Sequence, residues 1–186
     1  MKALMLILFS FLSIFSNGQD LPFGIIENSI HRWQDSGKII YVRNELPFSN
    51  DAKAILFRVG LRGTDTEPNK NVFRLNGNDK KLFLKQIESQ KVGTWPDSLF
   101  ANSKGLYKDS LNNILSKEDK GWQYFHKFLG PKYFEFSRPI ILRKNTIAIF
   151  TMIDMVGGSS GSYRMYIYKK KNGQWKKFVV QGIGAW

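Results

Sequence analysis

The chain has 186 residues, no cysteine, and 28 lysines and arginines against 15 aspartates and glutamates, so its formal net charge is +13. The lack of cysteine excludes thiol catalysis, disulfide bonds and cysteine-based zinc sites. The positive charge favours anionic partners such as acidic polymers. The lysines are scattered, without an arginine-rich segment or an aromatic RNA-binding motif, so specific nucleic-acid binding is not expected.

The first 18 residues have the build of a secretory signal peptide. Lys2 precedes an apolar run over residues 3–15, and small residues follow at 16–18. The run is shorter than the ~20 residues of a membrane-spanning helix, although an uncleaved N-terminal anchor is an alternative. We expect cleavage near Gly18 and export to the periplasm or the exterior. Residues 19–186 are then expected to form a single domain without a transmembrane segment.

Helices are expected in the first half of this domain. Apolar residues at helical spacing predict a helix over 22–36, and the β-branched and aromatic run at 38–43 predicts a short strand. Alternating apolar residues favour a strand over 51–63, but Asp51 could equally cap a helix there. Residues 64–71 read as a polar loop.

Two more helices are expected near the middle of the chain. Residues 78–90 have one apolar side and one charged side. Residues 116–131 begin with a pattern resembling a capping box and end in Gly-Pro. Gly121 inside this helix costs about 1 kcal/mol relative to alanine. Between the helices, residues 94–105 are expected to form an irregular loop anchored by Trp95.

The last third of the chain predicts an antiparallel meander. Residues 145–156 are apolar on both faces, as in a strand covered on both sides, whereas 163–170 alternate like a half-exposed strand. Asn172-Gly173 is a strong hairpin signal leading into a third strand over 174–180. The expected fold class is α+β, with N-terminal helices packed on a C-terminal antiparallel meander. The ending also resembles the tail of nuclear-transport-factor-2-like cone folds.

The segment GGSSGS at 157–162 lies between two predicted strands. A phosphate-binding loop needs a helix after its glycines, and here a strand follows. A flexible linker is also disfavoured, because both flanks can pair. We predict a wide hairpin loop in which the glycines supply positive φ or close backbone approach and the serines satisfy backbone groups. Loops commonly carry function, which makes this segment a candidate binding site.

Residues 136–175 carry a composite pattern. Its parts are a Phe-Ser-Arg-Pro entry, two loop glycines, and a Lys-Lys-x-Asn-Gly-x-Trp exit, at Phe136, Ser137, Arg138, Pro139, Gly157, Gly161, Lys170, Lys171, Gly173 and Trp175. The block resembles the C-terminal part of a family of small uncharacterised secreted bacterial proteins. Val156 and Ser160 stand where that family often has two cysteines. The resemblance implies export and no particular activity.

Candidate catalytic groups are few. Hydrolysis usually needs a base, most often histidine, and neither His31 nor His126 has a metal-binding spacing. Asp154, at the end of the apolar strand, is the other candidate base if its carboxylate is buried there. We expect it instead to face solvent at the loop edge and accept backbone N–H bonds.

Aromatic side chains gather on the two last hairpin strands, at Tyr163, Tyr166, Tyr168 and Trp175. They form either a stacking platform for a sugar or peptide, or cross-strand packing under a helix.

The expected function is that of an exported, non-catalytic binding module for an anionic or glycan-like partner, without a cofactor or metal. A small hydrolase using His126 or Asp154 is one alternative. An inhibitor or immunity-type protein with one protein partner is another. The candidate binding residues are Asp154, Gly157, Gly158, Ser159, Ser160, Gly161, Tyr163 and Trp175.

Overall fold

A computed structural model describes residues 21–34, 38–58, 60–62, 72–97, 99–117 and 120–185. The predicted signal peptide, residues 1–18, and the whole predicted loop at 64–71 lie outside these ranges. Within them, no helix is both long and apolar enough to cross a membrane.

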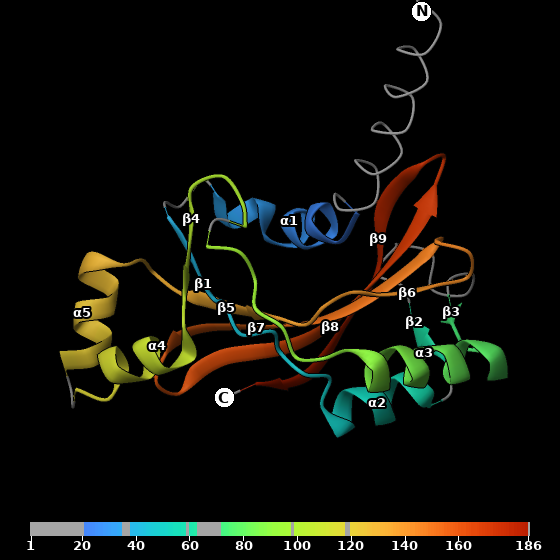
Figure 1. The fold of residues 1–186 in the computed structure, drawn as a ribbon, viewed down its shortest axis with the longest axis horizontal. Helices are drawn as coiled ribbons and strands as arrows, with labels where there is room; N and C mark the ends of the chain where they lie inside the picture. The colour runs from blue at the N-terminus through green and yellow to red at the C-terminus, as the bar shows by residue number, and fades with distance from the viewer. Residues whose placement is uncertain are drawn as a thin grey trace, which may run out of the picture.

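The fold is α+β and is built around a mixed sheet (Figure 1). Its strand order is β4-β1-β5-β7-β8-β9, and β6 also pairs with β7. β1 pairs in parallel with β4 and β5, and the other ladders are antiparallel. The strands are β1 (Ile39–Val42), β4 (Ser103–Leu106), β5 (Tyr133–Phe136), β6 (Ile140–Leu142), β7 (Ile147–Gly157), β8 (Ser160–Lys171) and β9 (Gln174–Ala185), with β2 (Leu61–Arg62) and β3 (Val72–Phe73) in a separate ladder.

Helices cover both faces of the sheet. One face packs against α1, and the opposite face packs against α2 and α3 at one end and α4 and α5 at the other (Figure 1). The helices are α1 (Leu21–Gln34), α2 (Asn50–Phe57), α3 (Gly77–Ser89), α4 (Lys108–Leu115) and α5 (Lys120–Phe128). The C-terminal meander β7-β8-β9 and the helix at 78–90 are thereby confirmed.

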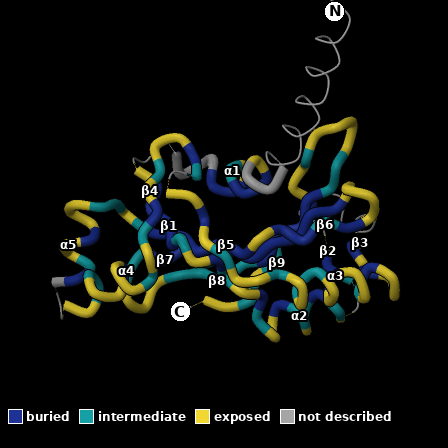
Figure 2. The backbone as a smooth tube through the Cα atoms, viewed as in Figure 1, coloured by how far each residue is buried: buried dark blue, intermediate teal, exposed yellow. Residues whose placement is uncertain are grey.

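The core lies in the central strands, which are buried along most of their length (Figure 2). Phe150 of β7 faces the α1 side, and Ile149 faces α2 and α3, which confirms the strand covered on both sides. The half-exposed reading of 163–170 is wrong. Tyr166 and Tyr168 are buried because α1 covers their face, and the Tyr168 hydroxyl lies 2.7 Å from the Ser29 hydroxyl of that helix.

The preferred strand over 51–63 is also wrong, because α2 occupies most of it. The Ser49 side chain caps the helix by accepting a hydrogen bond from the Ala52 N–H at 3.1 Å, and Asp51 lies in the first turn. Ala52 and Leu56, four residues apart, are the buried pair. The alternation of apolar residues was therefore a coincidence within a helix.

Two further expectations need correction in the middle of the chain. The loop at 94–105 is anchored by buried Trp95 as predicted, but its last residues form β4. Ser116 ends α4 as its C-cap instead of opening the next helix. A capping box does occur earlier, where Asn76 and Asp79 exchange hydrogen bonds at the start of α3.

Thr151 in β7 gives a stability prediction. It is fully buried, and its Oγ1 has no hydrogen-bond partner in the described part of the chain. Its backbone N–H donates instead to Ser137 Oγ at 2.8 Å. Thr151→Val removes an unsatisfied hydroxyl and keeps the shape, so we expect the free energy of unfolding to rise by about 1 kcal/mol in urea denaturation. Ser137→Ala, which removes a used acceptor, should lower it. A loss of stability in Thr151→Val would mean that the hydroxyl is satisfied.

Candidate functional site

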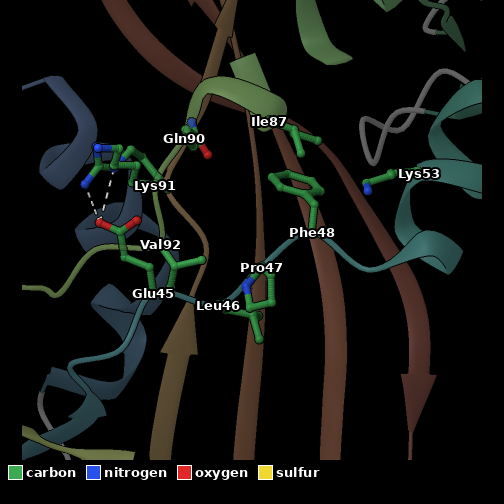
Figure 3. Close-up of a pocket in the computed structure, with 10 residues that line it drawn as sticks. Glu45, Leu46, Pro47, Phe48, Lys53, Ile87, Gln90, Lys91 and Val92 are labelled. Carbon is green, nitrogen blue, oxygen red and sulfur yellow. Dashed lines mark hydrogen bonds and ion pairs between the residues drawn. The ribbon is translucent and has the colours of Figure 1, made fainter. Parts of the chain in front are cut away.

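A pocket of about 180 Å³ opens between the chain before α2 and the end of α3 (Figure 3). The segment 45–48 forms one wall, and 87–92 forms another. α2 contributes Lys53, and the loop after β5 contributes Arg138. The lining residues are Glu45, Leu46, Pro47, Phe48, Lys53, Ile87, Gln90, Lys91, Val92 and Arg138.

Backbone hydrogen bonds hold the wall formed by 45–48 against the sheet. Glu45 N–H donates to Gly93 O at 3.1 Å, and Leu46 N–H donates to Phe136 O at 2.7 Å. The Phe48 ring meets the Phe83 ring of α3 edge to face, with centroids 5.3 Å apart. These contacts fix the apolar side of the pocket, so the pocket is preformed.

An ion pair forms the polar side of the pocket. Arg138 donates to Glu45 Oε1 through Nε at 3.2 Å and also through Nη2. The Glu45 side chain is only 6% exposed, whereas that of Arg138 is 47% exposed. A Cβ on Gly93 would lie 2.9 Å from Glu45 Oε1, so this pair needs a glycine at the position where the chain passes it.

The net positive charge of the pocket comes from its two lysines, because Glu45 balances Arg138. Lys53 and Lys91 lie on opposite sides of Phe48 and Pro47 (Figure 3). Neither lysine forms an ion pair in the described part of the chain. The pocket therefore joins an apolar floor to a cationic rim, which suits a ligand with a negative charge and an apolar face.

The glycine-serine segment forms a tighter turn than predicted. Gly157 pairs with Ser160, which leaves only Gly158 and Ser159 in the turn, and a register irregularity after Met155 accommodates the shorter connection. None of Gly157, Gly158 and Gly161 has positive φ. Gly158 is exposed, and a Cβ at this position would make only an ordinary contact with Trp122 Nε1 of α5, at 3.5 Å.

Asp154 does not face solvent, contrary to the prediction. Its carboxylate lies 3.5 Å from Lys132 Nζ and 3.8 Å from Arg164 Nη1, and its side chain is 12% exposed. Ser162, its partner in the β7-β8 register, donates a hydrogen bond to it. Asp154 falls on the sheet face that carries these cations, which explains the difference. Its side chain ties β7 to β8 and to Lys132, the residue just before β5.

The other predicted catalytic groups are not assembled with Asp154. His126 is exposed, and its Nε2 lies 3.0 Å from Val156 O. The His31 side chain lies outside the described part. Burial and, to a smaller extent, the Glu135 charge raise the pKa of Tyr133 to about 12, so Tyr133 stays protonated near neutral pH. The described residues contain no group of three His, Asp or Glu side chains that could hold a metal.

The four aromatic residues of the last hairpin do not form one surface. Tyr166, Tyr168 and Trp175 belong to the core on the α1 side, whereas Tyr163 packs on the opposite face. The Tyr163 hydroxyl donates to Ser49 Oγ at 3.2 Å. Cross-strand packing under a helix is thus confirmed for Tyr166 and Tyr168, and the four rings are divided between the two faces of the sheet.

The pocket was not predicted from the sequence. It combines three regions that are distant along the chain, which are residues 45–53, residues 87–92 and Arg138, and each region alone has the pattern of an ordinary loop or helix end. In the sequence, Arg138 stands out only as part of the Phe-Ser-Arg-Pro pattern, which gives no sign of a pocket.

Comparison with known proteins returned no family model, no curated protein and no solved structure that matches this chain. The fold and the pocket define an α+β protein with a preformed, cation-rimmed apolar hollow.

Proposed function

We propose that the protein is an exported, non-catalytic module that binds an anionic or glycan-like partner through this pocket. The observation that carries the proposal is the placement of Lys53 and Lys91 around the apolar floor formed by Pro47 and Phe48. An apolar hollow with a few converging polar groups is the usual form of a binding site. The signal-like segment at 1–18 and the resemblance of 136–175 to secreted bacterial proteins support export.

The hydrolase alternative has less support. Asp154 pairs with two cations and accepts a hydrogen bond from Ser162, which is the environment of a structural carboxylate. The ring nitrogen Nε2 of His126 is engaged by a backbone carbonyl. A general base has to reach the proton that it removes, and neither group lines the pocket.

Lysine variants test the proposal. The double substitution Lys53→Gln with Lys91→Gln should weaken binding of polygalacturonate about tenfold at moderate salt, because both rim charges are lost. The matched control is Lys176→Gln with Lys177→Gln, which removes the same charge from exposed positions on β9. Calorimetric titration of the three proteins gives the comparison. Equal losses of affinity in both variants would show that polymer binding depends only on the net charge of the protein.

A further inference from the structure

We infer that the pocket takes one acidic sugar unit of a linear polysaccharide, and that the polysaccharide chain crosses the pocket between Lys91 and Lys53. This inference rests on the proposed function and names the ligand class of the same site. Three features of the lining lead to it: its mixture of donors and acceptors, its apolar floor, and the separation of its two lysines.

Donors and acceptors both line the pocket. Lys53, Lys91 and the Gln90 amide donate. Both hydrogen bonds from Arg138 go to Oε1 of Glu45, which leaves Oε2 as an acceptor. A simple carboxylate has no proton to give to this oxygen, and the Glu45 charge repels any compact anion placed beside it. A ligand that carries hydroxyl groups as well as negative charge satisfies the whole lining, and an acidic sugar is such a ligand.

The floor of the pocket is apolar and open. Val92 is 71% exposed and Pro47 is also exposed, so these two side chains are accessible to a ligand. Phe48 and Ile87 are less exposed and form the deeper part of the floor. An exposed apolar patch with a polar rim is typical of a binding surface. The C–H face of a sugar ring fits such a floor, because burying it removes apolar surface from water on both partners.

The size of the pocket indicates a polymer. Its volume of about 180 Å³ is below the range of roughly 300–1,000 Å³ that holds a complete small ligand. Lys53 and Lys91 lie on opposite sides of the floor, and they come from α2 and from the segment after α3 (Figure 3). Because the two lysines lie on opposite sides of the floor, a ligand with several negative charges suits them, and the charged units on either side of a seated ring can contact one lysine each.

The test is a calorimetric comparison of oligomers on the full chain. The probes are hexamers of galacturonate and of hyaluronan, monomeric galacturonate, neutral maltohexaose and hexaglutamate. We expect at least one acidic hexasaccharide to bind about tenfold more tightly than the monomer, the neutral hexamer and the acidic peptide. Lys53→Gln and Lys91→Gln should each lower the affinity for that hexasaccharide about threefold, and the control Lys176→Gln should not.

The outcomes separate the inference from the proposed function. Equal binding of monomer and hexamer would contradict the inference that the ligand is a polymer, and the pocket would then be a site for a single anion. Equal binding of hexaglutamate would contradict the inference that the ligand is a sugar, and it would indicate an acidic protein partner. Equal binding of maltohexaose would overturn the role of the lysines. If no probe binds, the proposed function fails together with the inference.

Discussion

Replacing Asp154 by alanine is expected to lower the free energy of unfolding by about 3 kcal/mol. The carboxylate lies 3.5 Å from Lys132 Nζ and 3.8 Å from Arg164 Nη1, and the Lys132 side chain is only 11% exposed. Alanine removes the negative charge that compensates this buried ammonium. Removing one partner of a buried ion pair is far more damaging than removing an exposed one, because the remaining charge stays desolvated.

Urea denaturation monitored by circular dichroism measures the effect. Asp97→Ala is the matched control, because Asp97 lies 3.6 Å from Arg43 but is 76% exposed. An exposed pair of this kind contributes less than about 1 kcal/mol. The pair of variants distinguishes a structural aspartate from a catalytic one. If Asp154→Ala keeps the stability of the wild type, its carboxylate is not a structural tie, and the hydrolase alternative regains support.

The features predicted correctly from the sequence are those whose signals are local. The Asn172-Gly173 turn needs positive φ at both residues, and both have it. The continuous apolar run of β7 predicts a strand buried on both faces, and the pattern of α3, apolar on one side and charged on the other, predicts a surface helix. Each of these segments contains its whole signal within about a dozen residues, so no tertiary information was needed.

The parallel part of the sheet has no such local signal. β1 pairs with β4 some sixty residues later and with β5 about thirty residues after that. The pairing of these strands depends on the tertiary fold, because parallel strands are joined by long connections. The short strands β4 and β5 also lack the alternating pattern or the flanking turns by which a strand can be predicted from sequence. In the α2 segment the local pattern exists but is ambiguous. Its apolar residues fit both the two-residue period of a strand and the period of a helix, and the cap formed by Ser49 favours the helix.

Buried carboxylates are the second class of feature that the sequence hides. Four of them pair with a basic residue of another segment, and they are Glu45 with Arg138, Asp79 with Arg143, Glu135 with Lys108, and Asp154 with Lys132. The partners are separated by between about twenty and ninety residues, so no spacing rule connects them. The same reason hides the pocket, because its polar wall is one of these pairs.

The pairing of Asp79 with Arg143 also affects how the stability of the fold depends on pH. Burial alone would raise the pKa of Asp79, but hydrogen bonds from the Arg143 guanidinium and the Asn76 N–H lower it below its ordinary value. A depressed pKa in the folded state means that this carboxylate stabilises the fold above its unfolded pKa, and that the contribution is lost as the pH falls.

Gly121→Ala is expected to lower the free energy of unfolding by about 2–3 kcal/mol, although alanine is the better helix former by about 1 kcal/mol. A Cβ at this position would lie 2.4 Å from Leu115 O and 2.9 Å from Ile114 O. Both oxygens belong to the backbone at the end of α4, so no side-chain rotation can relieve the clash. Alanine would have to push α5 away from α4 and open the core that contains Leu111 and Phe125.

The matched control is Gly77→Ala, at the first residue of α3, where a new Cβ meets nothing within 4 Å. Helix propensity acts there without a steric penalty, so this variant should be neutral or slightly more stable. Thermal and urea unfolding of the two variants then separate propensity from packing. Stabilisation by both alanines would show that α4 and α5 are not in backbone contact. Opposite signs would show that Gly121 is required by the close approach of the two helices, whose packing fixes the end of the sheet next to the glycine-serine turn.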